Sequence, residues 1–290
     1  MNELGFENFK YPTYVNYTPK NDIVGKTYYV GIGVNEFKDT EQNLKYCVKD
    51  VEDLAKVFAN KKSKVETVLY TNSEVTKENI LALKSYLQEN TTVNDKVIIS
   101  CSSHGLLDDS LNFYLATYDV DFSNPKERGL KYEELESLLD GIPARQKLLL
   151  LDACNSGENE RLLVEMNKSN DIAKNDSKRG EELEIASKEV DTFQKMNELF
   201  VNVRNNTGSV IISAAGGLQS ALEAIEVDGK EIKNGAFTFT VLEYLNQSKE
   251  SEIKVNDLKL YVEKRVEEIT KGKQKPTSRQ ETMEVDWVVK

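Results

Sequence analysis

Residues 96–105, KVIISCSSHG, and residues 147–157, KLLLLDACNSG, decide the fold of this chain. Each stretch opens with a short, continuous apolar run, which is typical of a strand buried on both faces of a parallel sheet. Each run then gives way to small and polar residues, at the end of the strand where open parallel sheets bind their ligands. We therefore expect two buried strands that carry functional residues at their carboxyl ends.

Further apolar runs rich in β-branched residues predict three more strands of the same kind. The five predicted parallel strands are Thr27–Val34, Val65–Tyr70, Lys96–Ser100, Lys147–Leu151 and Ser209–Ala214. Apolar residues at helical spacing predict helices at Leu44–Phe58, Thr76–Glu89, Tyr132–Leu139, Phe237–Leu245 and Val255–Thr270. The alternating pattern of Met283–Val289 predicts a last strand at the sheet edge. Strands that alternate with helices indicate an α/β fold whose parallel sheet is covered on both faces.

The composition is that of a globular protein, with 39% apolar and 30% charged residues in a chain of 290. No apolar run reaches the roughly 20 residues of a membrane-spanning helix, and the first residues lack a secretion signal. A net charge of −11 argues against nucleic acid as a main partner, since phosphate binding needs clustered Lys and Arg. The three cysteines are widely separated and odd in number, which favours reduced thiols over disulfides or a zinc site. We expect a cytoplasmic protein that binds neither nucleic acid nor membranes.

One segment, residues 158–208, differs in kind from the rest. It is dominated by Glu, Lys, Asp, Asn and Ser and has no strand signal, although Glu182–Val203 has the spacing of a helix. A loop of this length inside a compact domain is usually functional or disordered. The predicted organisation is therefore an N-terminal arm at 1–25, a first part of the domain at 26–157, a charged linker at 158–208, and a second part of the same domain at 209–290.

The two strand ends bring the only histidine, His104, and one cysteine, Cys154, to the same edge of the predicted sheet. Thiol proteases need this pair, because the thiolate is the nucleophile and the imidazole removes and returns the proton. Taken alone, a single histidine is more often structural, and a cysteine at a strand end is often a small buried hydrophobe. Asp152 and Gly157 near the cysteine are poor core residues, and Gly105 lets a backbone N–H approach a ligand closely. These flanks favour the catalytic interpretation.

Residues 103–105 (SHG) and 152–157 (DACNSG) together resemble the two catalytic motifs of the caspase superfamily, and the His–Cys separation of 50 residues is typical of caspases. The resemblance is closest to the metacaspase, paracaspase and bacterial orthocaspase branch. It extends over nearly the whole chain after residue 25, through residues 29–35, 44–51, 213–215 and 234–238, which are similar to family strands and helices. It implies a three-layer α/β/α sandwich with a mostly parallel six-stranded sheet. Residues 26–157 would be the large subunit and residues 209–290 the small one.

The resemblance also implies a mechanism. Cys154 would attack the scissile carbonyl, and His104 would protonate the leaving amine. The backbone N–H groups of Gly105 and Cys154 would form the oxyanion hole. No third catalytic residue is evident in the sequence, so a dyad is expected.

Specificity is expected to differ from that of animal caspases, whose pocket for an acidic side chain carries arginines and a Gln two residues before the nucleophile. Here that position is Asp152, an acid that metacaspases and paracaspases use to bind Arg or Lys with a second acid where Asp50 aligns. Residues 221–223 also lack the arginine that animal caspases place there. Two carboxylates suit a guanidinium, so the resemblance implies cleavage of proteins or peptides after Arg or Lys. The alternative for Asp50 is a solvated carboxylate at a helix start.

The linker occupies the place where caspases are cleaved between their subunits. It contains basic residues that an Arg- or Lys-specific enzyme could cleave, namely Arg161, Lys168, Lys174, Lys178, Arg179 and Lys188. Self-processing is therefore one hypothesis. A charged surface insertion without processing is the other.

Many metacaspases need calcium, and the acidic residues available for it here are Asp108, Asp109, Asp119 and Asp121. Their spacing is not that of an EF-hand loop, and a solvated acidic turn explains them as well. We predict no obligatory metal and no other cofactor.

The main prediction is a caspase-like cysteine endopeptidase in bacterial signalling, defence or cell death, with a regulatory partner. One alternative is an inactive caspase-fold scaffold or regulatory protein, and another is an enzyme with a single dedicated partner as substrate. A nucleotide-binding fold is excluded because Gly31 and Gly33 lie within the first strand and no third glycine completes a phosphate loop.

Overall fold

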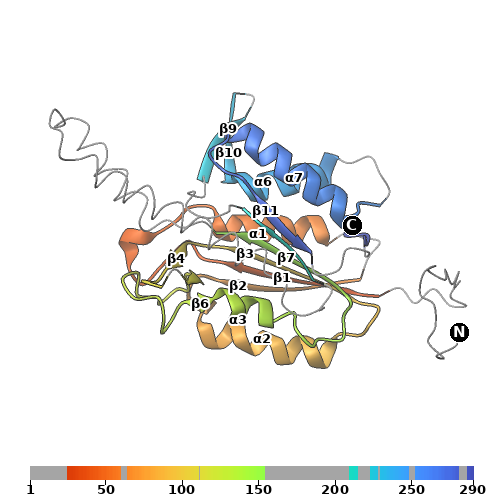
Figure 1. Ribbon diagram of the computed structural model, residues 1–290, viewed down its shortest axis with the longest axis horizontal. Coiled ribbons are helices and arrows are strands. Elements are labelled where there is room, and N and C mark those ends of the chain that lie inside the picture. Colours follow the sequence, from red (N-terminus) through yellow and green to blue (C-terminus); the bar gives the residue numbers. More distant parts are fainter. Residues whose placement is uncertain are drawn as a thin grey trace, which may run out of the picture.

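The computed structural model describes residues 25–59, 64–110, 112–153, 209–214, 223–227, 229–247, 252–280 and 286–290. The predicted N-terminal arm up to residue 24 and the whole region from 154 to 208, with the helix predicted at Glu182–Val203, lie outside the described residues. Figure 1 shows one central sheet with helices on both faces and smaller antiparallel sheets beside it.

The central sheet has six strands in the order β11-β8-β7-β3-β1-β2. These are β1 (Thr27–Gly33), β2 (Val65–Thr71), β3 (Lys96–Ser102), β7 (Gln146–Asp152), β8 (Ser209–Ser213) and β11 (Thr277–Gln280). The first five pair in parallel, and β11 runs antiparallel to β8. Every residue of β1 and β8 is buried, as continuous apolar runs predict. The expected α/β sandwich with a mostly parallel six-stranded sheet is confirmed.

Helices cover both faces of this sheet. In Figure 1, α2 (Lys77–Asn90) and α3 (Tyr132–Ser137) lie below it, and α1 (Cys47–Phe58), α6 (Ala236–Gln247) and α7 (Val255–Ile269) lie above. The helix predicted from Leu44 begins at Cys47 instead. Asn35 explains the later start, because its carbonyl accepts from the N–H of Leu44 at 2.8 Å and its side chain accepts from the N–H of Val48 at 3.0 Å.

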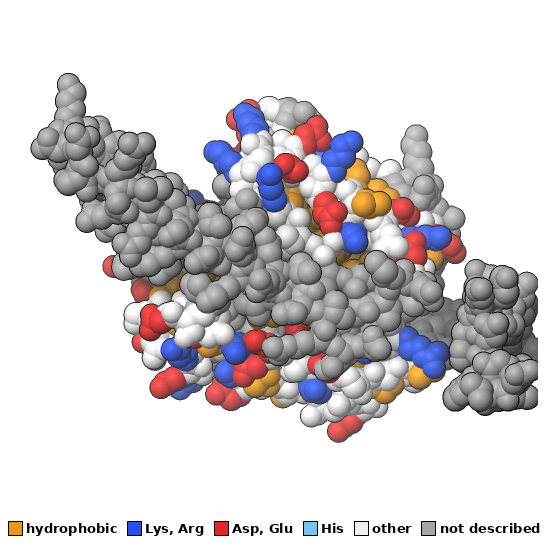
Figure 2. Space-filling view, viewed as in Figure 1, with side chains coloured by type: hydrophobic (Ala, Val, Ile, Leu, Met, Phe, Trp, Pro, Cys, Tyr) orange, Lys and Arg blue, Asp and Glu red, His pale blue; other side chains and the backbone are white. Residues whose placement is uncertain are grey.

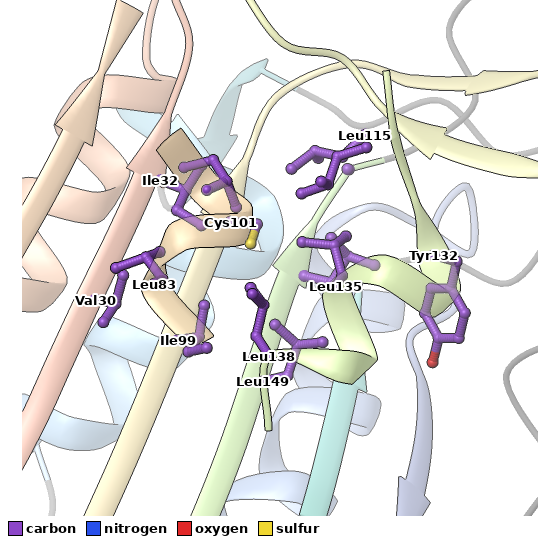
Figure 3. Close-up of a cluster of buried hydrophobic side chains, with 14 of the residues drawn as sticks. Val30, Ile32, Leu83, Ile99, Cys101, Leu115, Tyr132, Leu135, Leu138 and Leu149 are labelled. Atoms are coloured by element: carbon purple, nitrogen blue, oxygen red, sulfur yellow. The ribbon is translucent and has the colours of Figure 1, made fainter. Parts of the chain in front are cut away.

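Each face of the sheet has its own hydrophobic core. Figure 3 shows the core on the α2 and α3 side, where Val30 of β1, Ile99 of β3 and Leu149 of β7 lie near Leu83 of α2 and Leu135 of α3. The alternate residues of the same strands point to the other face and pack beneath α1, α6 and α7. The strands are therefore held from both sides, which fixes the positions of their carboxyl ends.

Short elements that the sequence did not predict surround the sheet. The strands β4 (Gly105–Leu107), β5 (Phe113–Leu115) and β6 (Leu130–Lys131) form an antiparallel sheet directly after β3. The strands β9 (Glu223–Val227) and β10 (Lys230–Gly235) form a hairpin that leads into α6. Two single turns of 3-10 helix, η1 (Thr40–Gln42) and η2 (Asn72–Glu74), lie in loops. Most of these segments are only two or three residues long and carry too little periodicity to be recognised from sequence, and β9 and β10 together contain more polar than apolar residues.

The prediction of an edge strand at Met283–Val289 is wrong for residues 286–289, which form no strand, while Met283–Val285 lie outside the described residues. The edge position belongs to β11, whose polar sequence TSRQ suits a strand with one open side. The alternation near the C-terminus has another cause, since Trp287 and Val289 are buried in the core beneath α7. Their segment makes only an isolated antiparallel bridge, between Val288 and Lys254.

On the face shown in Figure 2, acidic and basic side chains are interspersed over the described surface rather than gathered by sign. Among the described residues, no helix has the length and apolarity to span a bilayer.

Candidate active site

The register of the central sheet aligns the two candidate motifs. Strands β3 and β7 are neighbours, and Ser102 at the end of β3 is paired with Asp152 at the end of β7. The N–H of Ser103 continues this alignment by donating to the carbonyl of Asp152 at 3.3 Å. His104 follows at once on the β3 side. Cys154, the predicted nucleophile, lies outside the described residues, two positions after Asp152.

The ring of His104 is held by a backbone carbonyl and by two aromatic rings. Its Nε2 atom lies 2.8 Å from the carbonyl oxygen of Gln42, in the loop between β1 and α1. The ring centroid of Phe37 lies 5.3 Å from that of His104, and the centroid of Phe122 lies 5.6 Å away with its plane at 84°. Because a carbonyl oxygen can only accept, this contact assigns the proton to Nε2 and leaves Nδ1 as the proton acceptor. None of these three contacts was predicted from the sequence.

Gly105, predicted to supply an oxyanion-hole N–H, is the first residue of β4 and pairs with Leu115 of β5. The small sheet fixes the backbone on both sides of His104. The N–H of Ala116 donates to the carbonyl of His104 at 2.8 Å, and the hydroxyl of Ser103 donates to the carbonyl of Ala116 at 2.8 Å. The backbone that carries the histidine is thus anchored before any substrate binds.

The two predicted acids of the substrate pocket lie together. Asp50 is in the first turn of α1 and is 2% exposed, and Asp152 ends β7 and is 5% exposed. Both face Gly235: a Cβ atom at that residue would lie 2.5 Å from Oδ2 of Asp152 and 3.3 Å from Oδ2 of Asp50. The alternative of a solvated carboxylate for Asp50 is therefore wrong.

Donors from two strands, β10 and β3, surround Asp50. Its Oδ1 accepts from the side-chain amide of Asn234 at 2.9 Å and from the N–H of Gly235 at 3.2 Å. Its Oδ2 accepts from the hydroxyl of Ser102 at 3.0 Å. Burial raises the pKa of Asp50 well above its ordinary value, and the charge of Asp152 raises it further; the hydrogen bonds offset only part of this effect.

Asp152 is bound by the beginning of α6. Its Oδ2 accepts from the hydroxyl of Thr238 at 2.7 Å and from the backbone N–H of the same residue at 3.2 Å. Thr238 and Asn234 were not predicted as site residues. Their only sequence signal was the resemblance of residues 234–238 to a family segment, which says nothing of their contacts.

Three of the four acidic residues considered for calcium, Asp108, Asp119 and Asp121, are engaged in local structure, and Asp109 is exposed. Burial alone would raise the pKa of Asp108, but hydrogen bonds from Asn112, Ser110 and Tyr114 outweigh it and lower the pKa below its ordinary value. Asp119 forms an ion pair with Arg128 at 2.7 Å. Within the described ranges, no three His, Cys, Asp or Glu residues lie close enough together to hold a metal ion.

The two other cysteines are poor nucleophiles. Cys47 and Cys101 are both buried in the cores. Burial raises the pKa of the Cys101 thiol to about 12, so it carries almost no thiolate near neutral pH. Cys154 remains the candidate nucleophile by position, and the basic residues considered for self-processing lie outside the described residues.

Comparisons with known proteins agree with this fold. A search of curated proteins finds no match. Among solved structures, the crystal structure of a protein from Geobacter sulfurreducens matches with a TM-score of 0.56 and 18% sequence identity, over 88% of this chain and 92% of that one. At this identity the likeness concerns the fold alone. A family model described as the caspase domain matches residues 30–287, and the chain therefore belongs to the caspase domain family of peptidase C14.

Proposed function

We propose that the protein is a cysteine endopeptidase that cleaves protein substrates after Arg or Lys, with Cys154 as nucleophile and His104 as general acid and base. The observation that carries the proposal is strand register. His104 and Cys154 each follow by two residues the paired positions Ser102 and Asp152 at the ends of neighbouring strands. Membership of the caspase domain family supports the same chemistry.

The reaction would proceed in two steps. The Cys154 thiolate bonds to the scissile carbonyl carbon, the C–N bond then breaks, and the leaving amine takes its proton from the His104 imidazolium. Water, activated by the same imidazole, next attacks the thioester and releases the acid product with the thiol. The N–H groups of Gly105 and Cys154 would bind the oxyanion, each donor contributing about 10²–10³ in kcat in comparable sites.

The orientation of the imidazole supports this role for His104. With Nε2 directed to the carbonyl of Gln42, Nδ1 is the atom left for proton transfer. The carbonyl also stabilises the imidazolium that forms when the thiol is deprotonated, because it accepts a charge-assisted hydrogen bond. A backbone oxygen thus supplements the dyad without a third catalytic side chain.

The acid pair supports the Arg or Lys preference. Asp50 and Asp152 are removed from water, and bringing a second negative charge into such a place is costly. A guanidinium or ammonium group would offset that cost, and a guanidinium can bind two carboxylate oxygens at once. The same preference would allow cleavage within the chain's own linker at 158–208. A role in bacterial signalling, defence or cell death, under a regulatory partner, belongs to this proposal.

Four peptides that differ only in the residue before the cleaved bond test the function: Arg, Lys, citrulline and Asp. The full chain should cleave the Arg and Lys peptides and should lose all cleavage on Cys154→Ala. The matched control is Cys101→Ala, which removes a thiol that is not ionised and should retain activity. Failure of the wild type to cleave any peptide would favour the inactive scaffold. A preference for Asp would overturn the basic specificity.

The same preparations test self-processing. Incubated alone, the wild type should break into two fragments with new termini after basic residues of 158–208, and Cys154→Ala should remain intact. A wild type that cleaves peptides and stays a single chain would show that processing is not required.

A further inference from the structure

The two acidic residues are held by one short segment, residues 234–238, which spans the end of β10 and the start of α6. Thr238 binds Asp152 through its hydroxyl and its backbone N–H, at 2.7 and 3.2 Å. Asn234 binds Asp50 through its side-chain amide at 2.9 Å, and the N–H of Gly235 adds a second bond to the same carboxylate at 3.2 Å. Four donors within five residues therefore fix the orientation of both carboxyl groups.

The geometry of Gly235 makes this arrangement tight. A Cβ atom at this position would lie 2.5 Å from Oδ2 of Asp152, closer than real Cβ contacts come, and 3.3 Å from Oδ2 of Asp50. The glycine is needed for space, because the carboxylates converge on its Cα from α1 and from β7. Any larger residue here would force at least Asp152 to turn.

Asn234 is itself held in place. Its side-chain oxygen accepts from Lys49 Nζ at 3.2 Å, and its amide nitrogen also reaches Asp53 Oδ2 at 3.4 Å. Lys49 in turn forms an ion pair with Asp53 one turn further along α1. The amide group of Asn234 is thereby oriented with its nitrogen toward the acids.

We propose that Asn234 and Thr238 are specificity-positioning residues, which orient Asp50 and Asp152 so that the pair binds the basic side chain of the substrate. This inference rests on the proposed function and adds to it the residues that set the selectivity for positive charge. The acids come from the chain before residue 154, and the positioning residues come from the chain after residue 208. The pocket is therefore complete only when residues 234–238 pack against α1 and β7.

Replacement of one hydroxyl tests the inference. Thr238→Val keeps the shape of the side chain and the backbone N–H but removes the 2.7 Å bond to Asp152. The readout is the ratio of kcat/KM for the Arg peptide to that for the citrulline peptide, which has the same length without the charge. We expect the ratio to fall about tenfold, the size of one lost hydrogen bond to a charged group, mainly through KM.

Two matched variants separate positioning from general damage. Thr238→Ser keeps the hydroxyl and should restore the ratio to within about twofold. Thr240→Val makes the same change two residues later, where the hydroxyl bonds to the carbonyl of Ala236 at 2.9 Å, and should leave the ratio unchanged. Alkylation of Cys154 by iodoacetamide should keep its rate in all three variants, because that reagent does not use the acid pair.

The outcomes distinguish the two proposals. A wild type that prefers Arg to citrulline, together with a Thr238→Val ratio that is unchanged or higher, overturns the inference and leaves the proposed function standing. A wild type without that preference overturns the proposed specificity and the inference with it. If Thr238→Val does not fold, Asn234→Ala applies the same measurement to the Asp50 side of the pair, again with an expected fall in the ratio.

Discussion

The Nε2 atom of His104 lies 2.8 Å from the carbonyl oxygen of Gln42, so a backbone atom fixes the orientation of the only imidazole in the chain. Because the acceptor is a backbone carbonyl, it is still present when the side chain of Gln42 is replaced. Gln42→Ala should therefore keep kcat within about threefold of the wild type, while His104→Ala should lose the roughly 10²–10⁴-fold that acid–base catalysis supplies. Steady-state kinetics on the Arg peptide measures both. A loss in Gln42→Ala as large as that in His104→Ala would contradict the backbone assignment.

The position of that carbonyl depends on the next residue. The side-chain oxygen of Asn43 accepts from the N–H of Phe37 at 2.8 Å and so ties the two ends of the loop together. Asn43→Ala should loosen the loop and lower kcat about tenfold, since small displacements of catalytic groups are costly. KM should change little, because the side chains of Asp50 and Asp152 are held by Ser102, Asn234, Gly235 and Thr238, which lie outside this loop.

Phe122 provides a separate test of how the histidine is held. Its ring meets the imidazole edge to face and contacts Phe37 in the same way, with centroids 5.3 Å apart. Phe122→Ala removes one of the two aromatic rings that contact the His104 imidazole. It should lower kcat about tenfold with little change in KM. Phe122→Tyr keeps the ring and should restore most of the activity. Equal losses in the two variants would show that the effect comes from the loop rather than from the ring.

Asp50 should make the protein less stable as the pH rises. Burial and the charge of Asp152 raise its folded-state pKa, so the folded protein binds this proton more tightly than the unfolded chain does. The stability that the protonated group contributes is then present at low pH and is lost as the pH rises from the unfolded pKa through the raised folded one. Asp50→Asn carries no charge and should exceed the wild type in unfolding free energy near neutral pH by about 1 kcal/mol. Urea denaturation between pH 5 and 8, about one unit above the unfolded pKa and beyond, should show this difference growing with pH.

Asp53, one turn along the same helix, is the matched control with the opposite sign. Burial would raise its pKa, but the hydrogen bonds from Lys49 and Lys56 outweigh this effect and lower it. Asp53→Asn should therefore be less stable than the wild type near neutral pH, with the deficit shrinking as the pH falls. If Asp50→Asn and Asp53→Asn change the free energy of unfolding in the same direction, the different electrostatic environments of the two carboxylates do not explain their effects on stability.

The positions of His104 and Asp152 could be predicted because their information is local. A continuous apolar run identifies a buried strand, and the residues at its carboxyl end then share one edge of the sheet. The partners of these residues could not be predicted in this way. Thr238 is 86 positions from Asp152 in the chain, and Gln42 is 62 from His104. No periodicity in either segment encodes such a contact, since it depends on how α6 and the β1–α1 loop pack against the sheet.

The strand predicted at the C-terminus shows more directly what apolar alternation in a sequence cannot predict. Alternation at the C-terminus correctly indicated which side chains are buried, since Trp287 and Val289 are both in the core. A pattern of burial does not identify the element against which a segment packs, however, and here residues 286–290 pack under α7 instead of extending the sheet. The polar strand β11 (Thr277–Gln280) takes the edge, where apolar alternation is not needed.

The C-terminal segment should therefore be a large contributor to stability. Trp287 is 4% exposed and lies in the core formed with α6 and α7, and its carbonyl accepts from the N–H of Val255 at 3.0 Å. Trp287→Ala should lower the free energy of unfolding by about 3–5 kcal/mol, the usual cost of removing a large buried aromatic side chain. Val288→Ala is the control, because Val288 is only half-buried and its contact with Lys96 is made by its backbone carbonyl. It should cost less than about 1 kcal/mol. Equal losses in the two variants would mean that the segment is held by its backbone bonds rather than by the buried ring.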